Sequence, residues 1–237
     1  MLKAVFFDLD GTLLPLDEPK FLGVYMEVLL NRMIPAGLKK ENILNFSSSS
    51  YMAMVLNDGS KMNHEVFVNK FKEIHGHYTK EDADRIDDFY NNDFDQSLDV
   101  CGYNPLAKEI VKFVKDNGLI CVLSTNPVFP MVAQVKRMAR TGLEVSDFDY
   151  ITSYENSRFC KPNPNYFIDL LNKFNLKPDE VIVIGNNTYE DGECSLGANI
   201  KCYLVRDCLI DHPKATHKFD IIEMNQVIDK IKEWLCK

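Results

Sequence analysis

KAVFFDLDGT, residues 3–12, joins a short apolar run to a turn that carries two aspartates. The run contains several residues that favour β-structure, and the turn follows it directly after Asp8. A continuous apolar run of this length, bounded by a turn, predicts a strand that is buried on both faces, as the strands of parallel sheets are. The stretch therefore favours a parallel sheet with its first turn at Asp8.

Further runs of the same kind occur along the chain. They are LICVLST (119–125), VIVIG (181–185), KCYLV (201–205) and the shorter FDYIT (148–152). Segments with helical periodicity separate them, at 104–118, 128–141, 164–174 and 225–237. Strands that alternate with helices predict right-handed crossovers and a parallel sheet with helices on both faces. We therefore expect a doubly wound, Rossmann-like α/β fold.

The segment between the first two predicted strands differs from the rest. It contains no clear strand pattern, and helical periodicity appears in three places: 21–33, 63–76 and 81–93. The serines at 47–50 are expected in a loop or at the start of a helix. We predict an α/β core formed by residues 1–15 and 100–237, with residues 16–99 inserted after the first strand as a helical cap domain.

Composition excludes several classes of protein. The chain has 237 residues, 46% of them hydrophobic, and a formal net charge of −8. The length allows a sizeable core, and the acidic balance argues against a protein that binds nucleic acid through phosphate contacts. No apolar run reaches the ~20 residues that span a membrane. The seven scattered cysteines, an odd number without a C-x-x-C pair or a secretory signal, indicate a reducing compartment. We expect a cytoplasmic monomer or homodimer without nucleic-acid or membrane partners.

Polar residues follow the predicted strands at their carboxyl ends, where open parallel sheets bind ligands. They are Asp8, Asp10, Thr125, Asn126, Asn186, Asn187, Glu190 and Asp191. Lys161 lies in a predicted loop, before Pro162. Carboxylates, a hydroxyl group and a lysine at one edge of a sheet suit a phosphorylated substrate and a hard divalent cation. Mg²⁺ prefers oxygen ligands and needs only a few carboxylates when a phosphate is also present.

Four short motifs resemble those of the haloacid dehalogenase-like (HAD) hydrolases, and they occur in the order of that family. They are DLDGT (8–12), STN (124–126), KPNP (161–164) and GNNTYED (185–191). The place of the helical segment resembles that of the family's type-one cap. The resemblance covers the predicted core from end to end, and it implies a phosphatase that works through an aspartyl-phosphate.

The resemblance also implies roles for single residues. Asp8 would be the nucleophile, because an ionised carboxylate can split one difficult transfer into two easier ones. Asp10 would be the general acid and base, and its presence favours phosphoryl transfer over dehalogenation. Thr125 would donate its hydroxyl to the phosphoryl oxygens. Lys161 would neutralise charge on the phosphate and on Asp8.

Further residues of the motifs are implied in binding. Gly11, Thr12 and Asn126 would join Thr125 and Lys161 around the phosphate. The implied Mg²⁺ ligands are Asp8, Asp10 through its backbone carbonyl, Asp191, Asn186 and Asn187. Most members of the family carry aspartate where Asn186 stands here, so we expect metal binding to survive in a weaker form, with Asp191 as the main ligand and Asn187 as an auxiliary one.

The sequence therefore predicts a Mg²⁺-dependent phosphatase that acts on a small phosphorylated metabolite. A phosphomutase of similar architecture remains an alternative, and so does a phosphate-binding sensor that has lost catalysis through the two asparagines. The substrate would be selected by the helical segment, where Tyr25, Met26, Tyr51 and Met54 are candidates. His75 and His77 are expected at a solvated helix end.

Overall fold

The computed structural model describes residues 1–236, and in them one six-stranded parallel sheet has the order β3-β2-β1-β4-β5-β6. Its strands are β1 (Ala4–Phe7), β2 (Ile120–Leu123), β3 (Tyr150–Ile151), β4 (Val181–Gly185), β5 (Lys201–Val205) and β6 (Asp220–Ile222). The first strand is central, with Ala4 opposite both Ile120 of β2 and Val181 of β4. All five predicted strands are present, and the stretch at 148–152 contributes only two residues.

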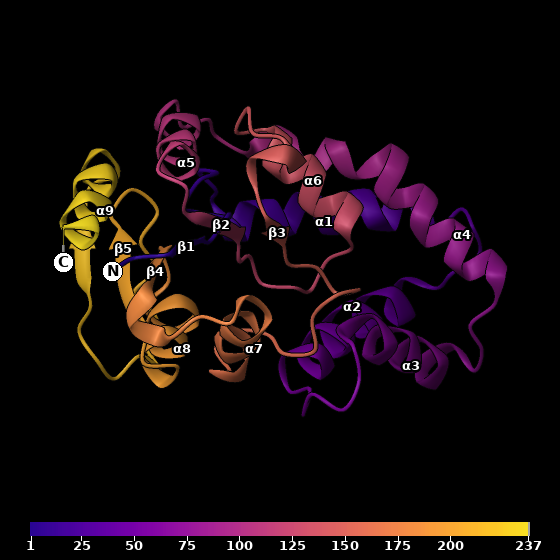
Figure 1. Ribbon diagram of the computed structural model, residues 1–237. Coiled ribbons are helices and arrows are strands. Elements are labelled where there is room, and N and C mark those ends of the chain that lie inside the picture. Colours follow the sequence, from indigo (N-terminus) through magenta and orange to yellow (C-terminus); the bar gives the residue numbers. More distant parts are fainter. Residues whose placement is uncertain (237) are drawn as a thin grey trace.

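Helices cover both faces of the sheet, as Figure 1 shows. One face packs against α5 (Leu106–Asp116), α6 (Met131–Ala139) and α9 (Val227–Leu235), and the other against α7 (Asn165–Phe174) and α8 (Cys194–Gly197). Because side chains alternate along a strand, Val5 and Phe7 face the first group while Ala4 and Phe6 face the second. All four side chains of β1 are buried. The doubly wound α/β fold predicted from the sequence is confirmed.

The helices begin and end close to where the sequence places them. For α5, the Asn104 side chain accepts a hydrogen bond from the Leu106 amide at 3.0 Å, and Gly118 follows the helix with a positive φ of 68°. The predicted helix at 225–237 appears as α9, and its last residue, Lys237, lies outside the described residues. No helix in residues 1–236 has the length and apolar character needed to cross a membrane.

The helical insert, which we define as residues 16–99, contains four α-helices in the described chain. They are α1 (Glu18–Met33), α2 (Lys40–Val55), α3 (Asn63–His75) and α4 (Lys80–Asp88), followed by a π-helical turn (Phe89–Asp93) and a 3-10 segment (Phe94–Val100). α2 and α3 pack together as a hairpin, while α1 packs against residues 89–100. Figure 1 shows α1 and α4 on one side of the insert and the α2–α3 hairpin on the other. The division of the chain into core and cap domain remains our prediction.

Two elements were not expected from the sequence. β6 has only three residues at the edge of the sheet, and Asp220 and Ile221 are exposed, so it has no apolar run. The prediction for Ser47–Ser50 was wrong, because these serines lie inside α2. Their hydroxyls turn back to the helix itself: Ser48 donates to the Leu44 carbonyl at 3.0 Å, and Ser49 to Asn45 Oδ1 at 2.9 Å. Such bonds let serine occupy a helix interior that its intrinsic preference disfavours.

A glutamate anchors the loop between β5 and β6 to the rest of the core. Glu193 accepts hydrogen bonds from the backbone amides of Thr216 and His217 and from His217 Nδ1. Burial acts to raise the pKa of Glu193, but the hydrogen bonds from Thr216 and His217 outweigh it and lower that pKa to about 2. The folded state therefore binds the proton of Glu193 more weakly than the unfolded chain does.

We expect Glu193→Gln to reduce the free energy of unfolding by about 1.5–3 kcal/mol at pH 6, the value of hydrogen bonds to a charged group. Because the folded pKa is lowered, the contribution of Glu193 is complete above its ordinary pKa and is lost as the pH falls toward 2. The difference from wild type should therefore narrow between pH 5 and pH 3 in urea titrations. The exposed Glu109→Gln should change stability by less than about 0.5 kcal/mol at both pH values. A gap that stays constant with pH would contradict the anchoring role.

Candidate active site

Three charged side chains from distant parts of the chain meet at the carboxyl end of the sheet. Asp8 follows β1, Lys161 lies in the loop before α7, and Asp191 lies in the π-helical turn Thr188–Glu193 after β4. Lys161 Nζ is 2.9 Å from Asp8 Oδ1 and 2.6 Å from Asp191 Oδ1. All three residues are buried, and Lys161 is 1% exposed. The structure thus brings together the predicted nucleophile, cation and main metal ligand, whose roles remain predictions.

The backbone after β4 fixes the carboxylate of Asp191. Its Oδ2 atom accepts the amide of Asn186 at 3.0 Å and that of Asn187 at 3.1 Å. This close approach requires a glycine at the end of the strand, because a Cβ atom on Gly185 would lie 2.3 Å from Asp191 Cγ. One oxygen of Asp191 is therefore held by the chain, and the other points to Lys161.

The turn after β1 holds Asp8 from the other side. Thr12 Oγ1 donates to Asp8 Oδ2 at 3.2 Å and is 3.4 Å from Asn186 Oδ1. Gly11 has a φ of 79°, and a Cβ atom there would lie 2.0 Å from Asn186 Nδ2. The DGT sequence is therefore required by a positive φ and by the contact between this turn and the loop after β4.

We expect Gly11→Ala to lower the free energy of unfolding by about 2–4 kcal/mol, because left-handed strain adds to a clash with Asn186. The matched control is Gly76→Ala. Gly76 ends α3 with a φ of 82°, and a Cβ atom there would meet nothing within 4 Å. That variant should lose only the backbone part, about 1–2 kcal/mol. If urea titrations gave the two variants equal losses of unfolding free energy, the expected clash between residue 11 and Asn186 would be excluded.

The two asparagines of the fourth motif have different positions. Asn186 Nδ2 donates to the Cys208 carbonyl at 2.8 Å, which leaves Asn186 Oδ1 directed at the turn that carries Asp8. Asn187 Oδ1 instead accepts the amides of Tyr189 at 3.0 Å and Glu190 at 3.2 Å. Asn187 is thus the cap of the π-helical turn. Since both acceptor positions of its oxygen are used, the ligand role predicted for Asn187 does not fit this structure.

Asp10 is paired with an arginine that the sequence analysis did not identify. Arg137 of α6 donates through one nitrogen to Asp10 Oδ2 and through another to Gln134 Oε1. Arg137 is 2% exposed, and its guanidinium lies 4.8 Å from the centre of the Phe129 ring. The second oxygen of Asp10 is buried and has no hydrogen-bond partner within residues 1–236.

One sequence signal could have revealed this pair. Gln134 and Arg137 share the buried side of α6 with Ala133 and Met138. A polar side chain on the apolar stripe of a helix needs a partner, because burying it alone is costly. The signal does not identify that partner, since Asp10 lies 127 positions away in the sequence.

The second motif contributes a hydroxyl and an amide. The Thr125 carbonyl accepts Thr152 Oγ1 at 2.7 Å and the Tyr166 hydroxyl at 2.9 Å. Its own hydroxyl makes no hydrogen bond within residues 1–236, and Thr125 lines the cavity described below. Asn126 Nδ2 donates to Glu190 Oε2 at 3.0 Å. Thr125 therefore has a donor to offer to a ligand.

The site carries more carboxyl groups than its cations balance. Burial, opposed by Lys161 and reinforced by Asp191, raises the pKa of Asp8 to about 7. Burial also raises the pKa of Glu190 to about 8, again against the effect of Lys161 and with that of Asp191. Burial acts to lower the pKa of Lys161, but Asp191 and Asp8 outweigh it and hold that pKa well above its ordinary value. The chain thus disfavours further negative charge at this position.

A hard divalent cation fits such a site. The available donors are oxygens of Asp8, Asp191 and Asn186, the ligand type that Mg²⁺ prefers. No group of three or more Asp, Glu, His or Cys side chains within residues 1–236 is arranged to hold a metal. The remaining positions would therefore belong to the backbone, to water and to a phosphate, as is usual for Mg²⁺.

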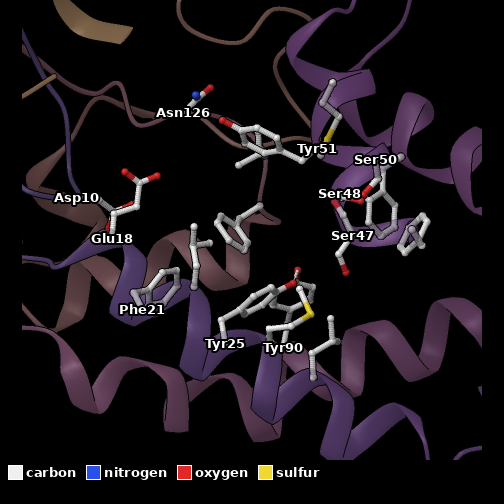
Figure 2. Close-up of a pocket in the computed structure, with 18 of the residues that line it drawn as sticks. Asp10, Glu18, Phe21, Tyr25, Ser47, Ser48, Ser50, Tyr51, Tyr90 and Asn126 are labelled. Atoms are coloured by element: carbon white, nitrogen blue, oxygen red, sulfur yellow. Dashed lines mark hydrogen bonds between the residues drawn. The ribbon is translucent and has the colours of Figure 1, made fainter. Parts of the chain in front are cut away.

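A cavity of about 610 Å³ begins at Asp8 and Asp10 and extends into the helical insert. Tyr25 and Met26 of α1, and Tyr51 and Met54 of α2, all line it, so the structure places the four candidate specificity residues on its walls. Figure 2 shows Tyr25 and Tyr51 on opposite sides of the cavity, with Asp10 at the end nearest the sheet. The cavity connects the acidic site to the interior of the insert.

Comparison with known proteins yields two family models that both describe the same kind of hydrolase. A family model described as haloacid dehalogenase-like hydrolase matches residues 2–192, and a HAD-hydrolase-like model matches residues 159–234. The glyceraldehyde 3-phosphate phosphatase of Pyrococcus furiosus is 25% identical over 193 residues, covering 80% of this chain and 75% of the relative. The pyrophosphatase PpaX of Bacillus cereus is 21% identical over 199 residues, covering 80% and 76%.

Solved structures share the fold over nearly the whole chain. A putative β-phosphoglucomutase from Thermotoga maritima has a TM-score of 0.58 at 18% identity and covers 98% of this chain and 99% of its own. A 2-haloacid dehalogenase from Pseudomonas syringae has a TM-score of 0.64 at 16% identity, with coverages of 99% and 100%. Their names denote different reactions, so this likeness concerns the fold alone.

Proposed function

This chain belongs to the haloacid dehalogenase-like hydrolase family, and we propose that it is a Mg²⁺-dependent phosphatase that hydrolyses a phosphate monoester through an aspartyl-phosphate on Asp8. One observation carries the proposal: Lys161 joins Asp8 to Asp191, and both aspartates line one cavity together with Asp10, two residues from Asp8. This arrangement offers a nucleophile, a cation and a proton donor to a single phosphoryl group. The name of one relative, glyceraldehyde 3-phosphate phosphatase, supports hydrolysis of a phosphate ester, and that of another, pyrophosphatase PpaX, supports phosphoryl transfer in general.

The first step joins an oxygen of Asp8 to phosphorus and breaks the ester P–O bond. For this step Asp10 must be protonated on the oxygen that Arg137 does not bind, and it gives that proton to the leaving alkoxide and becomes the carboxylate that acts as base in the second step. In the second step Asp10 removes a proton from water, which attacks the aspartyl-phosphate, releases inorganic phosphate and restores the carboxylate of Asp8. Lys161 and the free hydroxyl of Thr125 stabilise the phosphoryl oxygens in both steps.

Arg137 positions Asp10 for this role. Its ion pair fixes one oxygen of Asp10, and the other oxygen has no hydrogen-bond partner within residues 1–236. Asp8, Asp191, Asn186 and the backbone carbonyl of Asp10 would hold Mg²⁺. When bound, the cation would reduce the repulsion between the phosphate and the carboxylates.

A Mg²⁺-supplemented screen of phosphate monoesters, read out as released phosphate, tests this proposal. We expect turnover that EDTA abolishes and that Asp8→Asn lacks. Transfer of phosphate between two positions of a sugar, without release, would instead indicate a mutase. A wild type that is inert with every ester, together with turnover in Asn186→Asp, would indicate a phosphate sensor and overturn the proposal.

We also propose a cytoplasmic location. All seven cysteines are free, and Cys121, Cys160, Cys194 and Cys202 are buried among apolar side chains. Reduced, buried thiols of this kind are typical of a reducing compartment.

A further inference from the structure

We propose that the substrate is a phosphate monoester of a long, mainly apolar alcohol, and that the cavity in the helical insert binds the alcohol part. This inference rests on the proposed phosphatase function and adds the class of substrate to it. The small phosphorylated metabolite expected from the sequence is thereby narrowed to an amphipathic ester. The size of the cavity, its walls and its charges support this class of substrate.

The cavity is larger than a small polar alcohol requires. Its volume of about 610 Å³ equals the liquid volume of about twenty water molecules. Pockets of ~300–1,000 Å³ bury most of the surface of a drug-sized ligand. The alcohol part of a two- or three-carbon phosphate would leave most of this space without a partner.

The wall formed by α1 and the turn after α4 is apolar. Phe21, Tyr25 and Leu29 lie one helical turn apart on α1 and line the cavity, and Phe89 lies beside them. The rings of Tyr25 and Phe89 are 5.9 Å apart at a steep angle. The Tyr25 hydroxyl is hydrogen-bonded to that of Tyr90 at 3.0 Å, so its polar atom is already satisfied. This wall therefore offers an apolar surface to a ligand.

The opposite wall belongs to α2 and offers hydroxyl groups within an apolar surface. Ser47, Ser50, Tyr51 and Met54 line the cavity. Ser50 donates to the Ser47 carbonyl at 3.2 Å, but the Ser47 hydroxyl has no hydrogen bond within residues 1–236. Figure 2 shows the Ser47 hydroxyl directed into the cavity, and the Tyr51 hydroxyl directed toward Asn126.

The side of the cavity that α3 contributes contains an unsatisfied polar atom. His75 lines the cavity and stacks on Phe71, with ring centres 4.3 Å apart. Its Nε2 atom is buried and has no partner within residues 1–236, so the predicted solvated position was wrong for His75. Burial lowers the pKa of His75, which favours the neutral imidazole. His75 therefore offers no positive charge to an anionic group in the cavity.

The charges of the cavity exclude a second anion on the substrate. Among the described lining residues, the cations are Arg85 and Arg137. Arg85 is paired with Glu81 at 3.1 Å and with Asp82 at 3.4 Å, and Arg137 is paired with Asp10. No unpaired cation is therefore left in this part of the chain for a second phosphate or a carboxylate. The cavity therefore suits an uncharged alcohol part, whereas the second phosphate of pyrophosphate would lie in it without a cation.

A series of n-alkyl phosphonates from ethyl to octyl tests the inference by calorimetric titration in Mg²⁺. Phosphonates present the same anionic head, but they are not esters and report binding alone. We expect the affinity to rise about threefold to fourfold for each methylene group added, with an increasingly negative heat-capacity change. Equal dissociation constants from ethyl to octyl would overturn the inference.

A matched pair of variants locates the binding in the cavity. Ser47→Trp fills the space between α1 and α2, whereas Ser49→Trp makes the same change two residues away, at a position that does not line the cavity. We expect Ser47→Trp to weaken octylphosphonate at least tenfold and to leave ethylphosphonate unchanged. Ser49→Trp should alter neither. Equal weakening of both ligands by Ser47→Trp would also overturn the inference.

Hydrolysis of the matching alkyl phosphates separates the two proposals. Hydrolysis of ethyl and octyl phosphate with equal kcat/KM would remove the inference and leave the phosphatase intact. Phosphonate affinity that grows with chain length, without hydrolysis of any ester, would remove the phosphatase and leave the cavity as an amphiphile-binding site.

Discussion

Asp8→Asn is expected to lower kcat/KM for phosphate release by about 10⁴-fold or more, the order of loss seen when an enzyme loses its nucleophile. The amide is close in size to the carboxylate, but it lacks the anionic oxygen that attacks phosphorus. Single-turnover assays with the best ester from the screen measure the loss. Mass spectrometry of acid-quenched wild type should find a phosphoryl group on the peptide that contains Asp8, and none in the variant.

Stability shows whether Asp8→Asn acts through chemistry or through unfolding. The folded pKa of Asp8 is raised to about 7 by burial and by its carboxylate neighbours. Stability linked to Asp8 is therefore present below its ordinary pKa and is lost as the pH rises through about 7. Without added Mg²⁺ at pH 8, the neutral asparagine should leave the melting temperature equal or higher. A variant that keeps the wild-type rate would exclude Asp8 as the nucleophile.

Asp10→Asn provides a comparison on the same turn. A general acid and base contributes about 10²–10⁴-fold, so this variant should be slower than wild type and yet still able to form the aspartyl-phosphate with a good leaving group. Burst kinetics with an aryl phosphate would show a trapped intermediate. A complete absence of that intermediate would assign Asp10 a role in the first step that proton transfer does not explain.

Arg137→Met is expected to cost about 2–4 kcal/mol of unfolding free energy, somewhat less than the loss found when one partner is removed from a fully buried ion pair, because the Asp10 side chain is 26% exposed. The guanidinium is 2% exposed and contacts both Asp10 and Gln134. Methionine fills much of the space, but it leaves the carboxylate of Asp10 without a cation. Urea titrations at constant pH measure the change.

Arg140→Met is the matched control, three residues later at the end of α6. Its guanidinium is 40% exposed and lies 3.3 Å from Asp99, so its removal should cost less than about 1 kcal/mol. The double variant Arg137→Met with Asp10→Asn should be more stable than Arg137→Met alone, because no unpaired charge remains. Equal losses in Arg137→Met and Arg140→Met would mean that burial of the Arg137 guanidinium adds nothing to its pair with Asp10.

The sequence predicts the central sheet well because each strand from β1 to β5 coincides with an apolar run. Burial of all four residues of β1 requires such a run, and Asp8 marks its end. The edge strand β6 and the helix α2 lack this signal. In α2 the buried residues Ile43, Ser50 and Met54 are interrupted by polar positions, and the helix depends on packing against α3.

The candidate site divides along similar lines. Asp8, Lys161 and Asp191 stand in motifs at strand ends or in loops, so their convergence follows from the topology of a parallel sheet. The partner of Asp10 and the capping role of Asn187 depend on contacts that spacing does not reveal. The burial of His75 Nε2 likewise depends on tertiary packing, because the Phe46 ring of α2 lies 5.9 Å from the imidazole, whereas the stacking on Phe71 is a local contact within α3.

The helical insert is built as two pairs, α1 with residues 89–100 and α2 with α3, and the cavity lies between them. Few side chains therefore connect the α2–α3 hairpin to α1, and this hairpin should open locally at a lower free energy than the sheet does. Its backbone amides should exchange with deuterium faster than those of β1. An occupant of the cavity would contact both pairs of helical segments and slow that exchange. Ligand binding would therefore stabilise the closed position of the hairpin.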